Sequence, residues 1–219
     1  DTKPKYYYKA KDPCYGYILG QNRQGIYLIK LYFPLRKRHN IGDSKFITNC
    51  NVLEGLYNLE LDDYDYIIIT KSSKDRLAIG NRLESTHFLY GGAGVRLNIG
   101  IVNLPSESYK LKLKEYDWLK NKLKPDGLMF SLLDFDRTGR EGAKYMNETY
   151  NIPYMFITRG EFGLPNYHCK DFAELCEMYS NDEINNFLRE TKTYIELRYG
   201  TDRSEDSGIW GNCEYNLPF

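Results

Sequence analysis

The hydrophobic positions of this chain alternate between short β-branched or aromatic runs and longer segments with helical spacing. The short runs have the length and composition of buried strands and lie at residues 64–70, 98–104, 129–133 and 154–158. Apolar residues spaced for one helical face lie between and after them, at residues 76–83, 109–123, 141–149, 172–179 and 182–199. Alternation of this kind predicts a parallel sheet flanked by helices.

The first part of the chain has a different pattern. Residues 15–19 and 26–33 are rich in Tyr, Ile and Leu and flank a polar turn, so they predict a hairpin, and residues 45–49 predict a further short strand. We therefore expect an α/β fold (α+β overall) in three parts. These are a small, mixed, β-rich basic subdomain at 1–58, the parallel-sheet domain at 59–180, and a C-terminal helix with a polar tail at 181–219.

Composition narrows the functional classes. The chain has 30 basic and 30 acidic residues, so any binding to nucleic acid must come from local patches rather than a global field. Its five cysteines are an odd number without a CxxC pair, which argues against a zinc ribbon or a disulfide framework and favours a reducing, cytoplasmic compartment. No apolar run reaches membrane-spanning length, so we expect no membrane partner.

Two acids end the apolar run at 129–133. Asp134 and Asp136 are two residues apart, so alternation along the strand sends both side chains to the same side. Two like charges this close are unfavourable unless a cation lies between them, and carboxylate oxygens suit Mg²⁺ or Mn²⁺. Gly139 is expected to let the backbone turn tightly into the next helix. The alternative is a solvated acidic turn.

A loop rich in lysine and serine follows the first buried strand, where ligand sites of open α/β sheets lie. Its sequence is Lys71-Ser72-Ser73-Lys74-Asp75, and the helical pattern at 76–83 follows directly. The lysines predict an anion site. Either serine could instead serve only as the N-cap of the helix. The glycine-rich stretch at 91–94 lacks the ending of a P-loop and is interpreted as a connector.

Together these motifs resemble the Toprim domain shared by bacterial-type primases, type IA and II topoisomerases and some nucleases. The acids Asp134 and Asp136 with Gly139 match its acidic signature, and residues 45–49 with Gly55 and the following leucine resemble the segment that primases carry before Toprim. The loop at 69–75 resembles a variant of phage primase-like proteins, and Lys170-Asp171 resembles the pair that closes the primase Toprim. The resemblance covers residues 15–188.

The resemblance implies roles for particular residues. Asp134 and Asp136 would hold Mg²⁺ or Mn²⁺, which offsets charge on the attacked phosphate and on the leaving pyrophosphate. Nucleotide binding would use the loop and the later pair, namely Lys71, Ser72, Lys74, Asp75, Lys170 and Asp171. The single-stranded template would lie on the basic subdomain, against Arg36, Lys37, Arg38, Lys45 and Asn49, with Tyr27 or Tyr32 as stacking faces. A solvated basic loop and packed tyrosines are the alternatives.

One departure from the family concerns its glutamate. Most Toprim domains have glutamate and then glycine at the end of the first strand, where this chain has Lys71-Ser72. Glu107 is our candidate substitute as catalytic and metal-binding carboxylate; the alternative is a surface glutamate that caps a helix. Lys71 is expected to face the incoming triphosphate, or instead to pair with Asp134 or Asp136 when no metal is bound.

We therefore interpret the chain as resembling a phage-type DNA primase core, a nucleotidyltransferase that makes short RNA primers on single-stranded DNA from nucleoside triphosphates. A replicative helicase is a further partner that the resemblance suggests, in the bacterial host cytoplasm if the gene is phage-encoded. Two alternatives stay open. One is a Toprim nuclease or topoisomerase-like phosphodiester enzyme, although a nuclease usually keeps the glutamate. The other is a non-catalytic module that binds nucleotide or DNA, which the missing glutamate makes credible.

Overall fold

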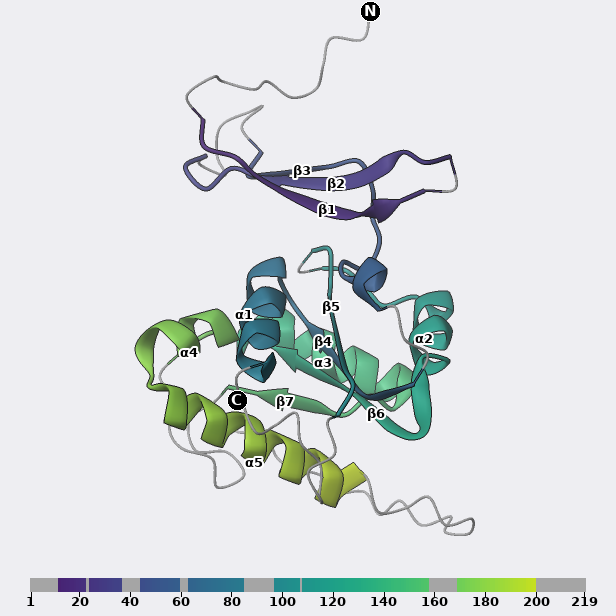
Figure 1. The fold of residues 1–219 in the computed structure, drawn as a ribbon, viewed down its shortest axis with the longest axis vertical. Helices are drawn as coiled ribbons and strands as arrows, with labels where there is room; N and C mark the ends of the chain where they lie inside the picture. The colour runs from purple at the N-terminus through teal and green to yellow at the C-terminus, as the bar shows by residue number, and fades with distance from the viewer. Residues whose placement is uncertain are drawn as a thin grey trace, which may run out of the picture.

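A four-stranded parallel sheet forms the centre of the protein (Figure 1). The computed structural model describes residues 12–22, 24–36, 44–59, 63–84, 97–106, 108–157 and 169–199. The sheet has the order β5-β4-β6-β7, from β4 (Tyr64–Thr70), β5 (Ile99–Asn103), β6 (Leu123–Leu133) and β7 (Tyr154–Phe156), and every neighbouring pair is parallel. The predicted α/β domain is confirmed, and β4 has the predicted bounds.

Helices cover both faces of this sheet. On one face α1 (Ser73–Glu84), α4 (Phe172–Met178) and α5 (Asn181–Tyr199) pack on a buried cluster that includes Ile68, Phe130 and Phe187. On the other face α2 (Leu113–Lys120) and α3 (Arg137–Tyr150) pack on a second cluster that includes Ile67 and Ile69. The consecutive isoleucines of β4 thus point to opposite faces, as period-two alternation requires. Helix α5, predicted as part of a separate C-terminal region, contributes to the core.

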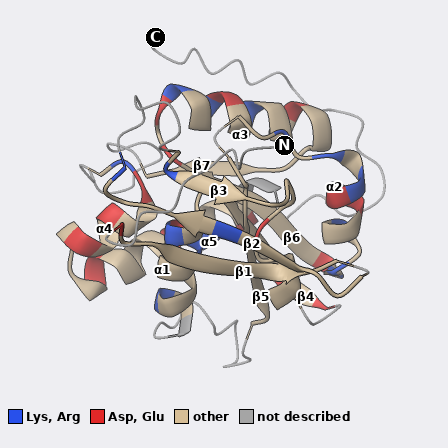
Figure 2. Cartoon of the chain, turned by 90° about the horizontal axis from the view of Figure 1, so that it is seen from above, with Lys and Arg blue, Asp and Glu red and all other residues tan. Residues whose placement is uncertain are grey.

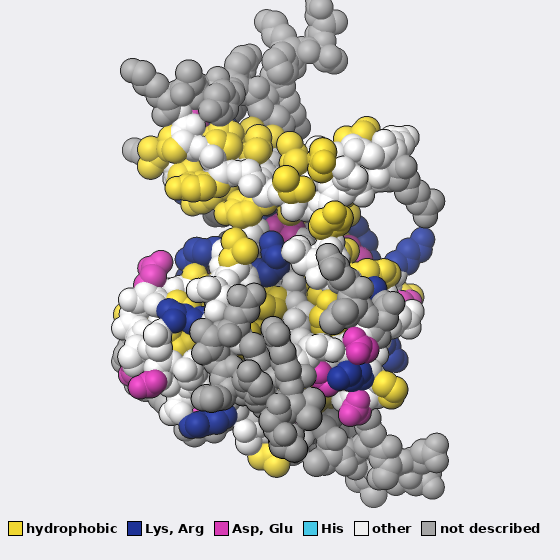
Figure 3. All heavy atoms as spheres, in the orientation of Figure 1, with side chains coloured by type: hydrophobic (Ala, Val, Ile, Leu, Met, Phe, Trp, Pro, Cys, Tyr) yellow, Lys and Arg dark blue, Asp and Glu magenta, His cyan; other side chains and the backbone are white. Residues whose placement is uncertain are grey.

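A three-stranded antiparallel sheet lies beside the carboxyl edge of the parallel one (Figure 1). It consists of β1 (Tyr15–Gln21), β2 (Tyr27–Tyr32) and β3 (Phe46–Thr48), with β2 in the middle. The predicted hairpin and third strand are therefore confirmed. Hydrophobic side chains gather over this sheet in Figure 3. A 3-10 turn, η1 (Leu56–Asn58), links it to β4.

The helix predicted at 109–123 is shorter than the sequence pattern suggests. Helix α2 ends at Lys120, and Leu123 already belongs to β6, where it pairs with Tyr64. The pairing is irregular between Tyr64 and Tyr66, and a Cβ on Gly127 would lie 2.5 Å from the Tyr64 carbonyl oxygen. Residues 125–127 therefore form an irregular part of β6, because glycine lets the two backbones approach.

Two regions named in the sequence analysis lie outside the described residues, the glycine-rich stretch at 91–94 and the tail at 200–219. Within the described part of the chain, no helix has both the length and the apolar character needed to cross a membrane.

Candidate metal and phosphate site

The two acids of the DxD motif lie at the carboxyl end of β6, in the connection to α3. Asp136 is the N-cap of α3, and its Oδ1 accepts a hydrogen bond of 2.8 Å from the Gly139 backbone N–H. Gly139 lies inside the first helical turn, and a Cβ there would lie 2.0 Å from the Asp134 carbonyl oxygen. Glycine is thus needed for a close approach rather than for the tight turn that the sequence suggested.

Lys71 bridges both acids. Its Nζ lies 2.8 Å from Asp134 Oδ2 and 2.9 Å from Asp136 Oδ2, and its side chain is only 7% exposed. Burial lowers the pKa of Lys71, but the hydrogen bonds to the two carboxylates outweigh it, so the pKa is raised. The two acids thus share the buried ammonium group of Lys71 in this structure. This arrangement is the ion-pair alternative for Lys71, not the free phosphate contact.

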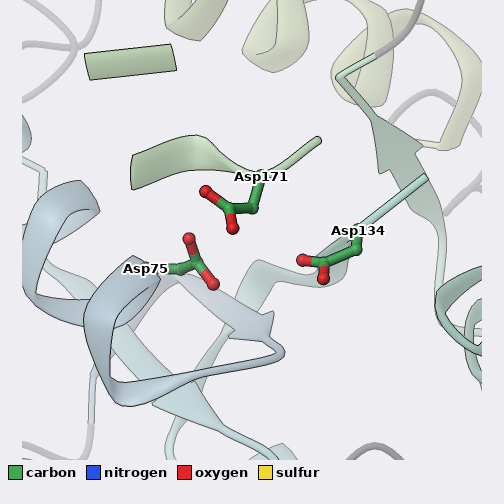
Figure 4. A group of neighbouring side chains, drawn as sticks. All are labelled: Asp75, Asp134 and Asp171. Carbon is green, nitrogen blue, oxygen red and sulfur yellow. The ribbon is translucent and has the colours of Figure 1, made fainter. Parts of the chain in front are cut away.

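Three carboxylates from distant parts of the chain, one of them Asp134, converge beside the Lys71 contact. Asp75 comes from the first turn of α1, Asp134 from the end of β6, and Asp171 is the N-cap of α4. One oxygen from each lies within 4.8 Å of the others, and Figure 4 shows the three carboxylates directed toward a common space. We call Asp75, Asp134 and Asp171 the acidic triad.

The acidic triad fits a hard divalent cation. Octahedral ligands at about 2.1 Å from Mg²⁺ lie about 3 Å from their neighbours and about 4 Å from the ligand opposite. The three carboxylate oxygens lie within 4.8 Å of one another, a spacing close to the ligand–ligand distances of such a coordination shell. Burial raises the pKa of Asp134, and Lys71 only partly offsets this. Burial also raises the pKa of Asp75, against hydrogen bonds from Ser72 and Ala173. Four carboxylates, those of the triad and Asp136, thus lie among three lysines, Lys71, Lys74 and Lys170, and a divalent cation would offset the remaining negative charge.

Two more lysines surround the acids and are largely exposed. Lys170 Nζ lies 3.7 Å from Asp134 Oδ2 and 3.8 Å from Asp136 Oδ2, and 56% of its side chain is exposed. Lys74 lies 3.5 Å from Asp171 with 57% exposure. Both ammonium groups can reach an incoming anion without first leaving the interior. Of the predicted phosphate-binding lysines, Lys74 and Lys170 are therefore better placed than Lys71.

The serines of this loop have structural partners. Ser72 Oγ accepts the Asp75 backbone N–H at 3.1 Å and donates to Asp75 Oδ2 at 2.5 Å. Ser72 therefore caps the start of α1 and orients a triad carboxylate. Ser73 donates to Glu54 Oε2. The N-cap alternative is thus observed for Ser72, whose hydroxyl acts on the triad through Asp75.

Glu54 is a buried residue next to this loop with several polar contacts, and the sequence analysis did not identify it. It is 1% exposed, and its Oε1 lies 2.5 Å from the Lys30 Nζ of β2, while Oε2 accepts from Asn103 Nδ2 at 3.0 Å. Gly55 follows with φ 92°, and a Cβ there would lie 2.9 Å from the Ile101 carbonyl oxygen. Glu54 thus connects the small sheet, the end of β5 and the start of α1. A lone acid among apolar residues was the available signal.

The predicted template-binding residues have different environments. The Arg36 guanidinium is buried, stacked 3.4 Å from the Phe33 ring centroid and paired with Asp12 at 2.5 Å. Asn49 Oδ1 accepts a hydrogen bond of 2.9 Å from the Ile29 backbone N–H, and Asn49 Nδ2 donates one of 2.8 Å to the Tyr27 carbonyl oxygen. Both side chains therefore stabilise the small sheet. Lys45 is half-buried, and Lys37 and Arg38 lie outside the described residues.

The two tyrosines proposed for base stacking also differ from each other. Tyr32 packs between the rings of Tyr15 and Phe46, with centroid distances of 6.3 and 4.9 Å. Tyr27 is 57% exposed. Packing therefore accounts for Tyr32, while Tyr27 retains an accessible ring. Glu107, the predicted substitute carboxylate, lies outside the described residues, and Asp75 and Asp171 are the carboxylates that the described structure brings to Asp134.

Comparison with known proteins gives structural likenesses only. No protein-family model and no curated protein matches the sequence. One similar chain is in a structure of bacteriophage T7 lagging-strand DNA polymerase interacting with primase domains of two gp4 subunits bound to an RNA/DNA hybrid and dTTP. It has 14% identity and a TM-score of 0.47, over 84% of this chain and 78% of that one. The Aquifex aeolicus primase, with its zinc-binding and RNA polymerase domains, has 17% identity and a TM-score of 0.47. That match covers 80% of this chain and 41% of the other.

Proposed function

We propose that this chain is the catalytic core of a DNA primase, which joins nucleotides into a short RNA on a single-stranded DNA template. The observation that carries the proposal is the acidic triad beside exposed Lys74 and Lys170 at the carboxyl edge of the parallel sheet. Carboxylates for a divalent cation next to cations for phosphate are what nucleotidyl transfer requires. The Toprim-like sequence motifs, with Asp134 and Asp136 in the expected places, support the same proposal.

In the proposed reaction the carboxylates of Asp75, Asp134 and Asp171 would hold Mg²⁺ or Mn²⁺. The bound cation would offset charge on the attacked phosphate and on the leaving pyrophosphate. Lys74 and Lys170 bind triphosphate oxygens as point charges. Ser72 and the Ala173 N–H fix the Asp75 carboxylate through hydrogen bonds of 2.5 and 3.1 Å. Lys71 holds Asp134 and Asp136 in place through its two hydrogen bonds. A divalent cation would compete with its ammonium group for the carboxylates, and a triphosphate would compete with the carboxylates for the ammonium group.

The remaining parts of the proposal concern partners. The template strand would contact the small sheet through Lys45, Lys37 and Arg38, with Tyr27 as a stacking face. Glu107 remains a candidate additional carboxylate. Nucleoside triphosphates are the proposed substrates, and a replicative helicase is a proposed partner. The odd number of cysteines favours a reducing compartment, the cytoplasm, which would be that of a bacterial host if the gene is phage-encoded.

A second candidate is a non-catalytic module that binds nucleotide or DNA. One observation favours it: Lys71 neutralises the same two acids that most members of the Toprim family use for metal. In that case the carboxylates would serve stability, and the exposed lysines would bind an anion without reaction. A Toprim nuclease is a weaker alternative because β4 ends in Lys71 rather than in glutamate.

One experiment separates these candidates. The chain is incubated with a single-stranded DNA template, labelled nucleoside triphosphates and Mn²⁺, next to the Asp134→Asn variant. We expect new labelled oligomers from the wild type and none from the variant. Cut template would instead support the nuclease, and retention of label without a product would support the binding module. Circular dichroism of the variant checks that its fold is retained.

A further inference from the structure

The most basic stretch of the described chain lies away from the acids, in and around α2. Residues 110–124 contain six lysines and two acids, Glu115 and Asp117, a formal charge of +4 in a protein whose net charge is zero. The lysines are Lys110, Lys112, Lys114, Lys120, Lys122 and Lys124. We call residues 110–124 the lysine segment. Figure 2 shows basic residues on α2, on the helical layer that it shares with α3.

The lysines of this segment mostly contact aromatic rings instead of carboxylates. Lys110 Nζ lies 5.0 Å from the Tyr145 ring centroid, Lys112 Nζ 5.2 Å from that of Tyr109, and Lys120 Nζ 5.9 Å from that of Tyr116. Among the described residues, no carboxylate oxygen lies within 4.0 Å of the Nζ of Lys110, Lys112, Lys114 or Lys120. A ring orients an ammonium group but leaves its charge available to an anion.

Lysines on other helices are different. On α3, Lys144 lies 3.6 Å from Glu148, and on α5, Lys192 lies 2.7 Å from Glu196, both one helical turn apart. Those pairs are the arrangement of an ordinary solvated helix. Four lysines of the lysine segment have no such ion pair with a described carboxylate, so the positive charge of the segment remains concentrated at the surface.

An aromatic side chain on the same helix face adds a second feature. Trp118 follows Lys114 by four residues in α2, so the two lie on one face of the helix. Lys122 lies just beyond the end of α2, and its Nζ is 5.1 Å from the Trp118 ring centroid. Trp118 is 38% exposed, while Leu119 beside it is buried in the core. Alternating ammonium groups and an exposed indole suit phosphates and bases of a single strand. An acidic protein would use the charges but not the ring face.

The segment is also joined to the helix that starts at the acids. The Leu111 carbonyl accepts a hydrogen bond of 2.9 Å from the Tyr150 hydroxyl of α3, and Tyr116 and Tyr150 stack with centroids 4.6 Å apart. Helix α3 begins next to Asp136. We propose that the lysine segment is a second binding surface for single-stranded nucleic acid, separate from the small sheet. This goes beyond the proposed function and does not rest on catalysis by the acids.

The test is strand binding in the absence of divalent cations, so that it is independent of catalysis. Fluorescence anisotropy with a labelled oligothymidylate compares the wild type with Lys110→Gln/Lys114→Gln. The matched control, Lys144→Gln/Lys192→Gln, removes the same charge from paired lysines. We expect about tenfold weaker binding in the test variant, and a log–log salt slope smaller by about 0.7 for each phosphate that is no longer neutralised. The control variant should show a smaller change in both the binding affinity and the salt slope.

A second measurement places the strand on the segment. In a Trp210→Phe background Trp118 is the one remaining tryptophan, so quenching of its fluorescence by the oligonucleotide reports contact there. Oligouridylate in a parallel titration tells whether template DNA or RNA product binds better, and tight binding of either supports the surface. Equal salt slopes in test and control variants, no quenching under saturating strand, or equal competition by polyglutamate of matched charge would each overturn the proposal.

Discussion

Lys71→Met removes the nearer and more buried of the two ammonium groups that lie beside both Asp134 and Asp136, and it keeps a side chain of similar length. Both carboxylate oxygens are within 2.9 Å of the same nitrogen. They are therefore at most about 6 Å apart, and without the lysine they repel by about 3 kcal/mol at an effective dielectric constant of about 20. Removing one partner of a buried ion pair costs about 3–5 kcal/mol, which agrees with this magnitude.

We expect the free energy of unfolding of Lys71→Met to fall by about 3 kcal/mol without divalent cations, and the melting midpoint to fall by about 6–12 °C for a chain of this size. Thermal and urea unfolding measure both. The Asp136 pKa is lowered because the Gly139 N–H and Lys71 outweigh burial, so its contribution is present above 3.8 and lost as pH falls through the lowered value. The raised pKa of Lys71 keeps its ammonium group charged up to pH 10.5. Because burial raises the pKa of Asp134, the deficit should begin to shrink, as pH falls, before 3.8 is reached.

Mn²⁺ should reverse this deficit. A divalent cation takes the place of the missing ammonium group, so saturating Mn²⁺ should raise the midpoint of Lys71→Met more than that of the wild type. Lys74→Met is the control, because Lys74 is exposed and 3.5 Å from Asp171, and its removal should change stability by less than about 1 kcal/mol. If Lys71→Met unfolds at the wild-type midpoint and responds to Mn²⁺ as the wild type does, the shared-cation reasoning is refuted.

Three further predictions follow from other contacts. Glu54→Gln leaves the Lys30 ammonium group buried without its counterion, so it should lower the free energy of unfolding by about 3 kcal/mol. Glu148→Gln, at an exposed ion pair, should change that free energy by less than about 1 kcal/mol. Equal midpoints of urea unfolding for the two variants would contradict this prediction. Gly139→Ala should lower the melting midpoint because its Cβ meets backbone at 2.0 Å, while Gly142→Ala in the same helix, whose Cβ meets only a Leu133 methyl at 3.5 Å, should not. Burial raises the pKa of Asp134 and Asp75, so protons should compete with Mn²⁺ for these carboxylates at pH values above 3.8. The affinity for Mn²⁺, measured by electron paramagnetic resonance, should therefore fall as pH is lowered toward 3.8. A Mn²⁺ affinity that does not change from pH 7 to pH 4 would count against this prediction.

Local pattern was enough to predict most of the fold. The strand β4 and the helices α3, α4 and α5 follow from apolar periodicity, because each buries a face whose spacing is visible in the sequence. The pattern failed at residues 109–123, where Tyr109, Leu111 and Leu119 are all buried but only Leu119 lies in a helix. Burial by an extended segment and burial by a helix leave similar apolar spacing, so backbone pairing of Leu123 with Tyr64 decided the outcome.

The site was predicted in part. Asp134 and Asp136 lie beyond the end of β6 and both contact Lys71, but the sequence did not determine whether Lys71 or a metal would lie between them. Asp75 and Asp171 were expected to bind nucleotide, and their approach to Asp134 depends on α1 and α4 packing on the same face of the sheet. Contacts over such sequence separations arise from tertiary packing and leave no local pattern. The same holds for Glu54 and Lys30, which come from separate segments of the chain.

The central claim is that the acidic triad binds a divalent cation, and direct titration of Mn²⁺ tests it. Free Mn²⁺ is followed by electron paramagnetic resonance as wild-type protein or Asp75→Asn is added, with Glu148→Gln as a control for removal of an exposed carboxylate. Since Asp75 supplies one of three converging carboxylates, we expect the wild type and Glu148→Gln to bind alike and Asp75→Asn to bind at least about tenfold more weakly, a decrease of about 1.4 kcal/mol. Mn²⁺ affinity of Asp75→Asn equal to that of the wild type would contradict the claim.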